Sequence, residues 1–335
     1  MSGSNIPYQL RPNKAVERFL WMEALDHVNK WTPLIDFVYV SMGGRYLEDF
    51  KLVHSRFGTR RLYSIEMDEV AYNRQVFNKP ISLLECLKTT TGDFVKDFAN
   101  FSHVIGHANY VFWFDYAVAK ARLEQLQEIQ SLVSKLEAND VVKLTMNAEL
   151  KTLGSNVGFS DRTAYQKQAA AKLADQLAEY CPDEGIPWEM MTQTGMASLL
   201  SSAVKNAFLR GLAGTPDLKA VPIASFRYSD GQHQMLTVVA IILNEDDSRR
   251  FESRTQLSKW PFRSVKWEDV HEVKVPDLTV KERMAIDQAL FADSIEGVHA
   301  ALPFKLDENE AESLQALKNY ETHYRRYPQF LRVNL

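Results

Sequence analysis

Carboxylates follow three of the β-prone runs in the first half of the sequence. Glu66, Asp93 and Asp115 each lie at or just past the end of such a run. In a parallel sheet, ligands bind outside the carboxyl ends of the strands, so side chains at these positions share one edge. A carboxylate there can accept hydrogen bonds from a ligand or remove a proton from it. The alternative role for each is to cap the helix that follows, which Asp68 could do beside Glu66.

A glycine pair precedes the first of these carboxylates. Gly43 and Gly44 follow a β-prone run, and glycines let the backbone approach a ligand closely. Glu66 lies 23 positions after Gly43, near the roughly 20-residue spacing at which an acidic side chain binds ribose hydroxyls. The stretch 41–46 lacks the third glycine of the Gly-x-Gly-x-x-Gly motif that binds a pyrophosphate. We therefore expect a nucleoside ligand without a pyrophosphate, such as S-adenosylmethionine, rather than a dinucleotide.

Alternating strand and helix patterns must position these residues. Apolar, β-prone runs predict strands, and apolar residues at spacings of three and four predict helices. The predicted strands are 37–41, 61–66, 81–87, 111–114 and 141–146. The predicted helices are 13–30, 46–57, 68–77, 94–98 and 121–136. Apolar strands separated by helices require crossover connections, which give a parallel sheet covered on both faces.

The second half of the chain changes pattern. Residues 149–214 have helical periodicity only, and two β-prone runs at 221–243 flank an Asp-Gly turn that predicts an antiparallel hairpin. Residues 244–254 are polar and predict a linker or exposed loop. The predicted fold class is α/β, with a Rossmann-like, mostly parallel sheet, a closing hairpin, a helical insertion and a helical C-terminal extension. The expected divisions are a core (1–148), an insertion (149–214; alternatively a separate helical domain), the hairpin (215–245) and an extension (246–335).

Four motifs together resemble a known family. They are the Gly-containing first loop, Ile-Glu-Met-Asp at 65–68, Thr-Gly-Asp at 91–93 and Trp-Phe-Asp-Tyr at 113–116. With the order of elements and the hairpin, they resemble a class I S-adenosylmethionine-dependent methyltransferase. The opening stretch 9–18 is similar to the O-methyltransferase-like group related to three-Cys-motif partner proteins. The resemblance covers residues 9–150 and the hairpin.

The resemblance implies roles for individual residues. Gly43 and Gly44 would line the methionine part of the cofactor, Glu66 would hold the ribose and Asp93 the adenine, while Asp115 would face the methyl donor. The full cofactor set is Ser41, Gly43, Gly44, Glu66, Met67, Asp93 and Asp115. Asp115 would act as general base, or would hold a metal or Lys14 for that purpose, and Tyr116 could stack on the acceptor. Lys14, Asp115 and Tyr116 are therefore the predicted catalytic residues.

The motif at 113–116 also limits the reaction. It lacks the two prolines of the Asp-Pro-Pro-Tyr motif that forms the floor under a flipped base, which disfavours N-methylation of bases. Neither Cys86 nor Cys181 follows a proline, which argues against cytosine C5 chemistry by a thiolate. Transfer to a hydroxyl or carboxyl oxygen remains, with an acceptor that the sequence does not identify.

A second hypothesis comes from the departures from the usual first motif. Tyr39 and Ser41 stand on the strand, and Arg45 follows the glycine pair. These departures favour a catalytically inactive methyltransferase fold with a regulatory or assembly role in a bacterial, phage-defence-like (antiviral) system, bound to a protein or RNA partner. The acidic residues after three predicted strands, Glu66, Asp93 and Asp115, favour the first hypothesis, an active methyltransferase.

Composition limits the partners and the compartment. The chain has 335 residues and a formal net charge of −4, so no global field attracts a polyanion. A nucleic-acid or protein contact is confined to local features such as the basic and aromatic tail 323–332 in the helical extension. His103 and His107 are the one histidine pair with ligand-like spacing, and we expect no metal. Two cysteines, no long apolar run and no signal sequence predict a cytoplasmic protein without membrane contact.

Overall fold

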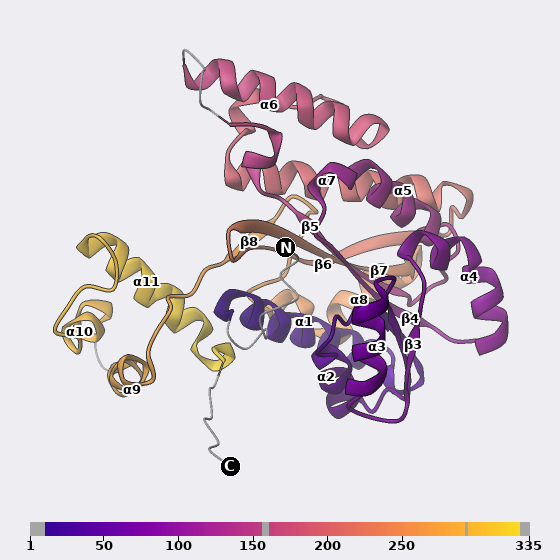
Figure 1. Ribbon diagram of the computed structural model, residues 1–335, viewed down its shortest axis with the longest axis horizontal. Helices are drawn as coiled ribbons and strands as arrows, with labels where there is room; N and C mark the ends of the chain where they lie inside the picture. The colour runs from indigo at the N-terminus through magenta and orange to yellow at the C-terminus, as the bar shows by residue number, and fades with distance from the viewer. Residues whose placement is uncertain (1–10, 156–160, 292–293, 329–335) are drawn as a thin grey trace.

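The computed structural model describes residues 11–155, 161–291 and 294–328. Within them an eight-stranded sheet has the order β3-β2-β1-β4-β5-β7-β6-β8 (Figure 1). The strands are β1 (Val38–Ser41), β2 (Arg61–Ile65), β3 (Leu84–Leu87), β4 (Tyr110–Tyr116), β5 (Val141–Asn147), β6 (Leu218–Asp230), β7 (His233–Asn244) and β8 (Val270–Val273). The helices are α1 (Pro12–Trp31), α2 (Glu48–Phe57), α3 (Glu69–Asn78), α4 (Thr91–Ile105), α5 (Arg122–Val133), α6 (Arg162–Leu177), α7 (Gln193–Gly211), α8 (Glu245–Thr255), α9 (Val280–Ala289), α10 (Ile295–Ala300) and α11 (Glu310–His323).

The first five strands are parallel, and the hairpin closes the sheet. β7 pairs antiparallel with both β5 and β6, and β8 pairs parallel with β6. Consecutive strands run outward in one direction from β1 to β3 and in the other from β4 to β5, so the direction reverses between β1 and β4. This reversal is the topological switch point at which open α/β sheets bind ligands. The arrangement confirms the predicted Rossmann-like fold class.

Helices cover both faces of the sheet (Figure 1). On one face, α4, α5, α6 and α7 share an apolar core with the strands, and α7 packs against α5 and the hairpin. On the other face, α1, α2 and α8 pack on the sheet, and the apolar residues of α9 to α11 join the same core. The helices of residues 149–214 therefore continue the layer begun by α4 and α5.

Two features of the second half differ from the sequence predictions. The predicted linker at 244–254 is wrong, because it is helix α8, which buries little more than Phe251 and Thr255 on the sheet. Its first turn is acidic and its last turn holds Arg254, an order that favours a helix through its dipole. The extension expected to be mainly helical also contributes strand β8, whose four residues include one buried side chain, Val273. Neither element has enough apolar residues for a periodic signal.

The described part of the basic and aromatic tail packs on its own chain. Arg326 donates to both carboxylate oxygens of Glu23 on α1, at 2.7 and 2.9 Å. His323 stacks on Phe262, and burial lowers the pKa of this histidine to about 4. Residues 329–332 of the tail, and residues 9 and 10 of the opening motif, lie outside the described residues.

Within the described ranges, no helix combines the length and apolar character that a membrane span needs.

Helix α1 is joined to the middle of the sheet by a buried ion pair. The Glu17 carboxylate lies 2.8 Å from the Lys143 ammonium of β5, and both side chains are completely buried. The ammonium also lies 3.5 Å from the centroid of the Trp113 ring. Burial lowers the pKa of Lys143 to about 8, and the Glu17 carboxylate opposes this shift. The contact between Glu17 and Lys143 therefore has the geometry of a buried ion pair that joins α1 to β5.

Breaking this pair from one side should be costly. We expect Lys143→Met to lower the free energy of unfolding by about 3–5 kcal/mol, because it leaves the Glu17 carboxylate buried without a partner. The double variant Glu17→Leu/Lys143→Met should recover at least half of that loss, since neither charge then remains buried. Urea unfolding at pH 7 measures all three proteins. A single variant as stable as the wild type would contradict the buried pair.

Candidate functional site

A cavity of about 670 Å³ opens at the carboxyl ends of the strands, beside the switch point. This volume lies in the range of small-molecule sites. Its walls come from the loop after β1, the start of α3, the end of β4, the end of β5 and the hairpin. The lining residues used below are Lys14, Gly44, Glu66, Met67, Val70, Asp115, Tyr116, Asp230 and His233.

The two glycines of the first loop have different environments. A Cβ on Gly43 would lie 2.5 Å from Phe50 and 2.7 Å from Leu47, so this glycine allows the loop to pack against α2. Gly44 has a φ of 52°, in the left-handed region, and it lines the cavity. Ser41 is buried in β1. Of the two glycines predicted to line the methionine part, only Gly44 lines the cavity, and Ser41 from the predicted cofactor set does not line it either.

The start of α2 is unsuited to a phosphate. Glu48 and Asp49 lie in its first turn, where the helix dipole would otherwise favour an anionic ligand. Tyr39 donates a hydrogen bond of 2.9 Å to Asp49, and Arg18 lies 3.4 Å from Glu48. Tyr39, which departs from the usual first motif, therefore serves to hydrogen-bond Asp49 at the start of α2. Two carboxylates occupy the place of a pyrophosphate site.

Glu66 faces the cavity because another residue caps the helix after it. Asp68 accepts the capping hydrogen bond from the Ala71 amide at 2.8 Å. Glu66 uses Oε1 to accept a hydrogen bond from the Asp68 amide at 2.9 Å, and burial raises its pKa. Met67 and Val70 beside it are 68% and 69% exposed, so they give the cavity an apolar wall. A half-buried carboxylate beside an apolar surface suits the ribose and base of a nucleoside.

Asp93 does not reach this cavity. It lies in the first turn of α4, where its amide donates to Thr90 Oγ1 at 3.0 Å and its carboxylate accepts from the same hydroxyl at 2.8 Å. Lys96 lies 3.7 Å from the carboxylate, and both side chains are largely exposed. Thr90 is thus the N-cap of α4, and Asp93 is the first-turn residue that pairs with it. Asp93, which was predicted to bind the adenine, thus does not line the cavity.

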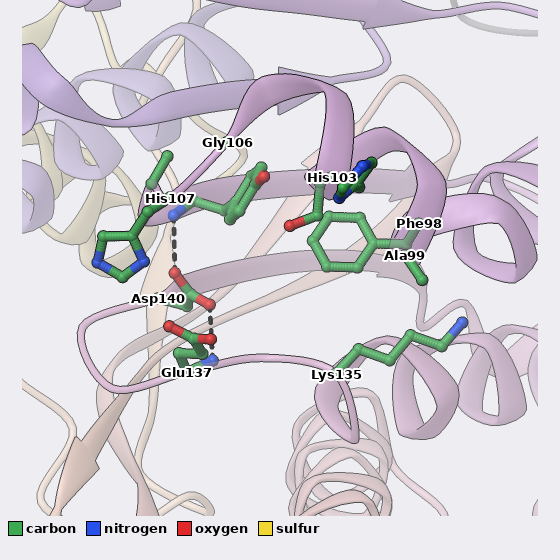
Figure 2. A pocket seen from close by; sticks show the side chains of 11 residues that line it. Phe98, Ala99, His103, Gly106, His107, Lys135, Glu137 and Asp140 are labelled. Carbon is green, nitrogen blue, oxygen red and sulfur yellow. Dashed lines mark hydrogen bonds between the residues drawn. The ribbon is translucent and has the colours of Figure 1, made fainter.

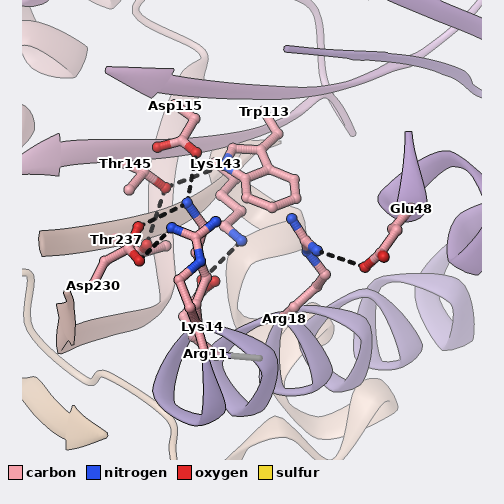
Figure 3. A network of polar contacts seen from close by, with 11 residues as sticks. Arg11, Lys14, Arg18, Glu48, Trp113, Asp115, Lys143, Thr145, Asp230 and Thr237 are labelled. Atoms are coloured by element: carbon pink, nitrogen blue, oxygen red, sulfur yellow. Dashed lines mark hydrogen bonds and ion pairs between the residues drawn. The ribbon is translucent and has the colours of Figure 1, made fainter. Parts of the chain in front are cut away.

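Lys14 and Asp115 meet in a network of charges (Figure 3). The Lys14 ammonium lies 3.2 Å from Oδ2 of Asp115 and 3.2 Å from Oδ2 of Asp230. Arg11 donates to Oδ1 of Asp230 at 2.5 Å. Burial raises the pKa of Asp115, but the charge and hydrogen bond of Lys14, together with the charges of Lys143 and Arg18, outweigh burial, so the pKa lies below its ordinary value. Asp115 is therefore an ionised, weakly basic carboxylate.

The hydroxyl of Tyr116 is already engaged. It donates to Oε2 of Glu128 on α5 at 2.5 Å, and Thr91 donates to the same oxygen at 2.8 Å. Burial and the Glu128 carboxylate together raise the pKa of Tyr116 well above its ordinary value. Its buried ring lines the cavity as a fixed surface.

Sequence reasoning did not assign Asp230 and His233 to the site. Asp230 ends β6 and His233 begins β7, and the two are paired in register on either side of the turn Gly231-Gln232. The turn predicts a hairpin, but only the antiparallel pairing of β7 with β5 brings its tip to the carboxyl edge of the parallel strands.

A second cavity, of about 350 Å³, lies near the amino ends of β4 and β5. Figure 2 shows residues that line it. Asp140 at its base accepts hydrogen bonds from the amides of Tyr110 and Glu137, and burial raises its pKa to about 7. His103 and His107 lie on opposite sides of this cavity in Figure 2. Among the residues that the structure describes, no group of three His, Cys, Asp or Glu side chains could hold a metal ion.

The family follows from the sequence as a whole. The profile of a family described as "Putative O-methyltransferase" matches residues 6–335. The chain belongs to this O-methyltransferase family. The match includes the helical insertion and the extension, which the resemblance of motifs did not cover. Among curated proteins, none matches the chain.

Solved structures resemble this O-methyltransferase family member at low identity. A protein described as "a putative sam-dependent methyltransferase from Streptococcus mutans" has 9% identity and a TM-score of 0.37 over 66% of this chain, which spans 48% of that protein's length. The plantazolicin methyltransferase BpumL has 11% identity and a TM-score of 0.39, covering 68% of this chain and 85% of its own. The O-methyltransferase TomG from Streptomyces achromogenes has 14% identity and a TM-score of 0.35, covering 72% and 92%. At such distance these likenesses assign no site residue.

The packing role of Gly43 predicts a loss of stability on substitution. Gly43→Ala should lower the free energy of unfolding by about 1–3 kcal/mol, because the added methyl group overlaps Phe50 and Leu47. Gly214→Ala is the matched control, since no heavy atom lies within 4 Å of its added Cβ. Urea unfolding compares them without ligand. Equal stability of the two variants would show that the loop is not packed in this way.

Proposed function

We propose that the chain is an S-adenosylmethionine-dependent methyltransferase that acts on a hydroxyl or carboxyl oxygen. The observation that carries the proposal is the position of Glu66 in a cavity beside the switch point, with Asp68 as the helix cap. The acidic start of α2 disfavours a pyrophosphate, and membership of the O-methyltransferase family supports transfer to oxygen.

The residues of the cavity fit such a cofactor. Glu66 accepts hydrogen bonds from the ribose hydroxyls, and Met67 and Val70 offer an apolar surface to the adenine. Gly44 allows the backbone to approach the methionine part of the ligand. When bound, S-adenosylmethionine supplies an electrophilic methyl group on a sulfonium. The protein then has to hold the acceptor oxygen near Asp115 and Tyr116 and exclude water from the cavity.

The reaction requires little proton chemistry from the protein if the acceptor oxygen is already ionised. Asp115 is a weak base because the Lys14 ammonium stabilises its charge. A carboxylate acceptor needs no base, whereas a hydroxyl acceptor must lose its proton to a group in or near the cavity. His233, which lines the cavity, is a candidate for this second case.

Calorimetric titration with S-adenosylhomocysteine tests the proposal. The wild-type protein should bind it, and Glu66→Gln should weaken binding about 10- to 100-fold, as expected when a hydrogen bond to a charged group is lost. Glu69→Gln, at an exposed position on α3 that does not line the cavity, should bind as the wild type does.

Absence of heat at millimolar ligand in the wild type would contradict the proposal. That result would favour the alternative, a methyltransferase fold that has lost catalysis and serves a protein or RNA partner. If the Glu66 and Glu69 variants bound S-adenosylhomocysteine equally well, the nucleoside would not bind at Glu66.

A further inference from the structure

Part of the cavity wall carries an alternating set of charges. Lys14 lies between the carboxylates of Asp115 and Asp230, and Arg11 supplies a second cation on Asp230. Their side chains are only 6–19% exposed. Figure 3 shows how α1, β4 and the hairpin each contribute to this network. The set therefore exists only in the folded chain.

The charges of this network restrict what can bind to it. Among the described residues, the two cations and two anions of this set sum to zero. Adding a net charge to a poorly hydrated set is unfavourable. A zwitterion adds one charge of each sign. Its carboxylate can approach Lys14 while its ammonium approaches Asp115, so the alternation of charges continues through the ligand.

The network lies at a suitable distance from Glu66. Glu66 directly follows β2, and Asp115 is the second-last residue of β4, with β1 between the two strands. Two strand spacings separate these ends by roughly 10 Å. A ribose bound at Glu66, with a short aliphatic chain on its 5′ carbon, spans this distance. S-adenosylmethionine ends such a chain in an α-amino acid.

We propose, on the basis of the function proposed above, that Lys14 and Asp115 bind the zwitterionic amino-acid end of the cofactor. Lys14 donates to the carboxylate, and Asp115 accepts from the ammonium. Asp230 and Arg11 are positioning residues that hold Lys14 over the cavity. Asp115 then serves as a ligand for the cofactor and not as the base. Its lowered pKa agrees with this role, because binding an ammonium requires the ionised form.

Two ligands that differ only at this end provide the test. S-adenosylhomocysteine carries the amino acid, whereas 5′-methylthioadenosine has the same nucleoside and a thioether without it. In calorimetric titrations of the full chain, Lys14→Met should weaken S-adenosylhomocysteine binding about 10- to 100-fold. The Kd of 5′-methylthioadenosine should stay unchanged.

Further variants keep the test independent of folding. Lys14→Arg retains the charge and should recover most of the affinity for S-adenosylhomocysteine. Lys205→Met removes a half-exposed cation on α7, outside the cavity, and should change neither ligand. Asp115→Asn should also weaken S-adenosylhomocysteine selectively, and it replaces Lys14→Met if circular dichroism shows that variant to be unfolded.

Each other outcome contradicts one claim. Equal weakening of both ligands by a folded Lys14 or Asp115 variant, or no weakening of S-adenosylhomocysteine, would overturn the amino-acid site. So would a wild-type protein that binds both ligands equally well, although the proposed function would stand. Binding of neither ligand by the wild type would contradict the proposed function itself.

Discussion

The buried ion pair between Glu17 and Lys143 fixes how helix α1 lies on the sheet. Two completely buried charges are unfavourable unless they meet, so the helix has one register in which both are paired. One turn earlier, that register brings Lys14 to Asp115 and Asp230. On the next residue of α1 it brings Arg18 over the Trp113 ring and to Glu48. Much of the polar wall of the cavity depends on this one docking geometry.

The charges around the cavity also determine which ligand fits. At the start of α2, Glu48 and Asp49 occupy the place where a dinucleotide would put its phosphates. Lys14, Arg11 and two aspartates form a neutral network near the end of β4. Glu66 and its apolar neighbours Met67 and Val70 also line the cavity and can bind a nucleoside. A ligand with a ribose, no phosphate and a zwitterionic end satisfies all three regions together.

The sheet and its order along the chain could be predicted because its strands are apolar on both faces and are separated by amphipathic helices. Glu66 could be predicted to face the cavity because Asp68 follows it and caps the helix. Other contacts could not be predicted from the sequence. Lys14 and Asp230 are 216 positions apart, and nothing local links them. The predicted adenine contact of Asp93 could not be separated from a role at the start of the next helix, and the structure places Asp93 in the first turn of α4, with Thr90 as the cap. Helix α8 has too few buried residues for a detectable period.

A crystal structure of the protein grown with S-adenosylhomocysteine tests this account most directly. The account predicts the ribose hydroxyls on Glu66, the adenine against Met67 and Val70, and the amino-acid end between Lys14 and Asp115. Asp93 would remain hydrogen-bonded to Thr90, the N-cap of α4, without ligand contact. A ligand bound elsewhere, or bound in this cavity with its ribose away from Glu66, would contradict the account.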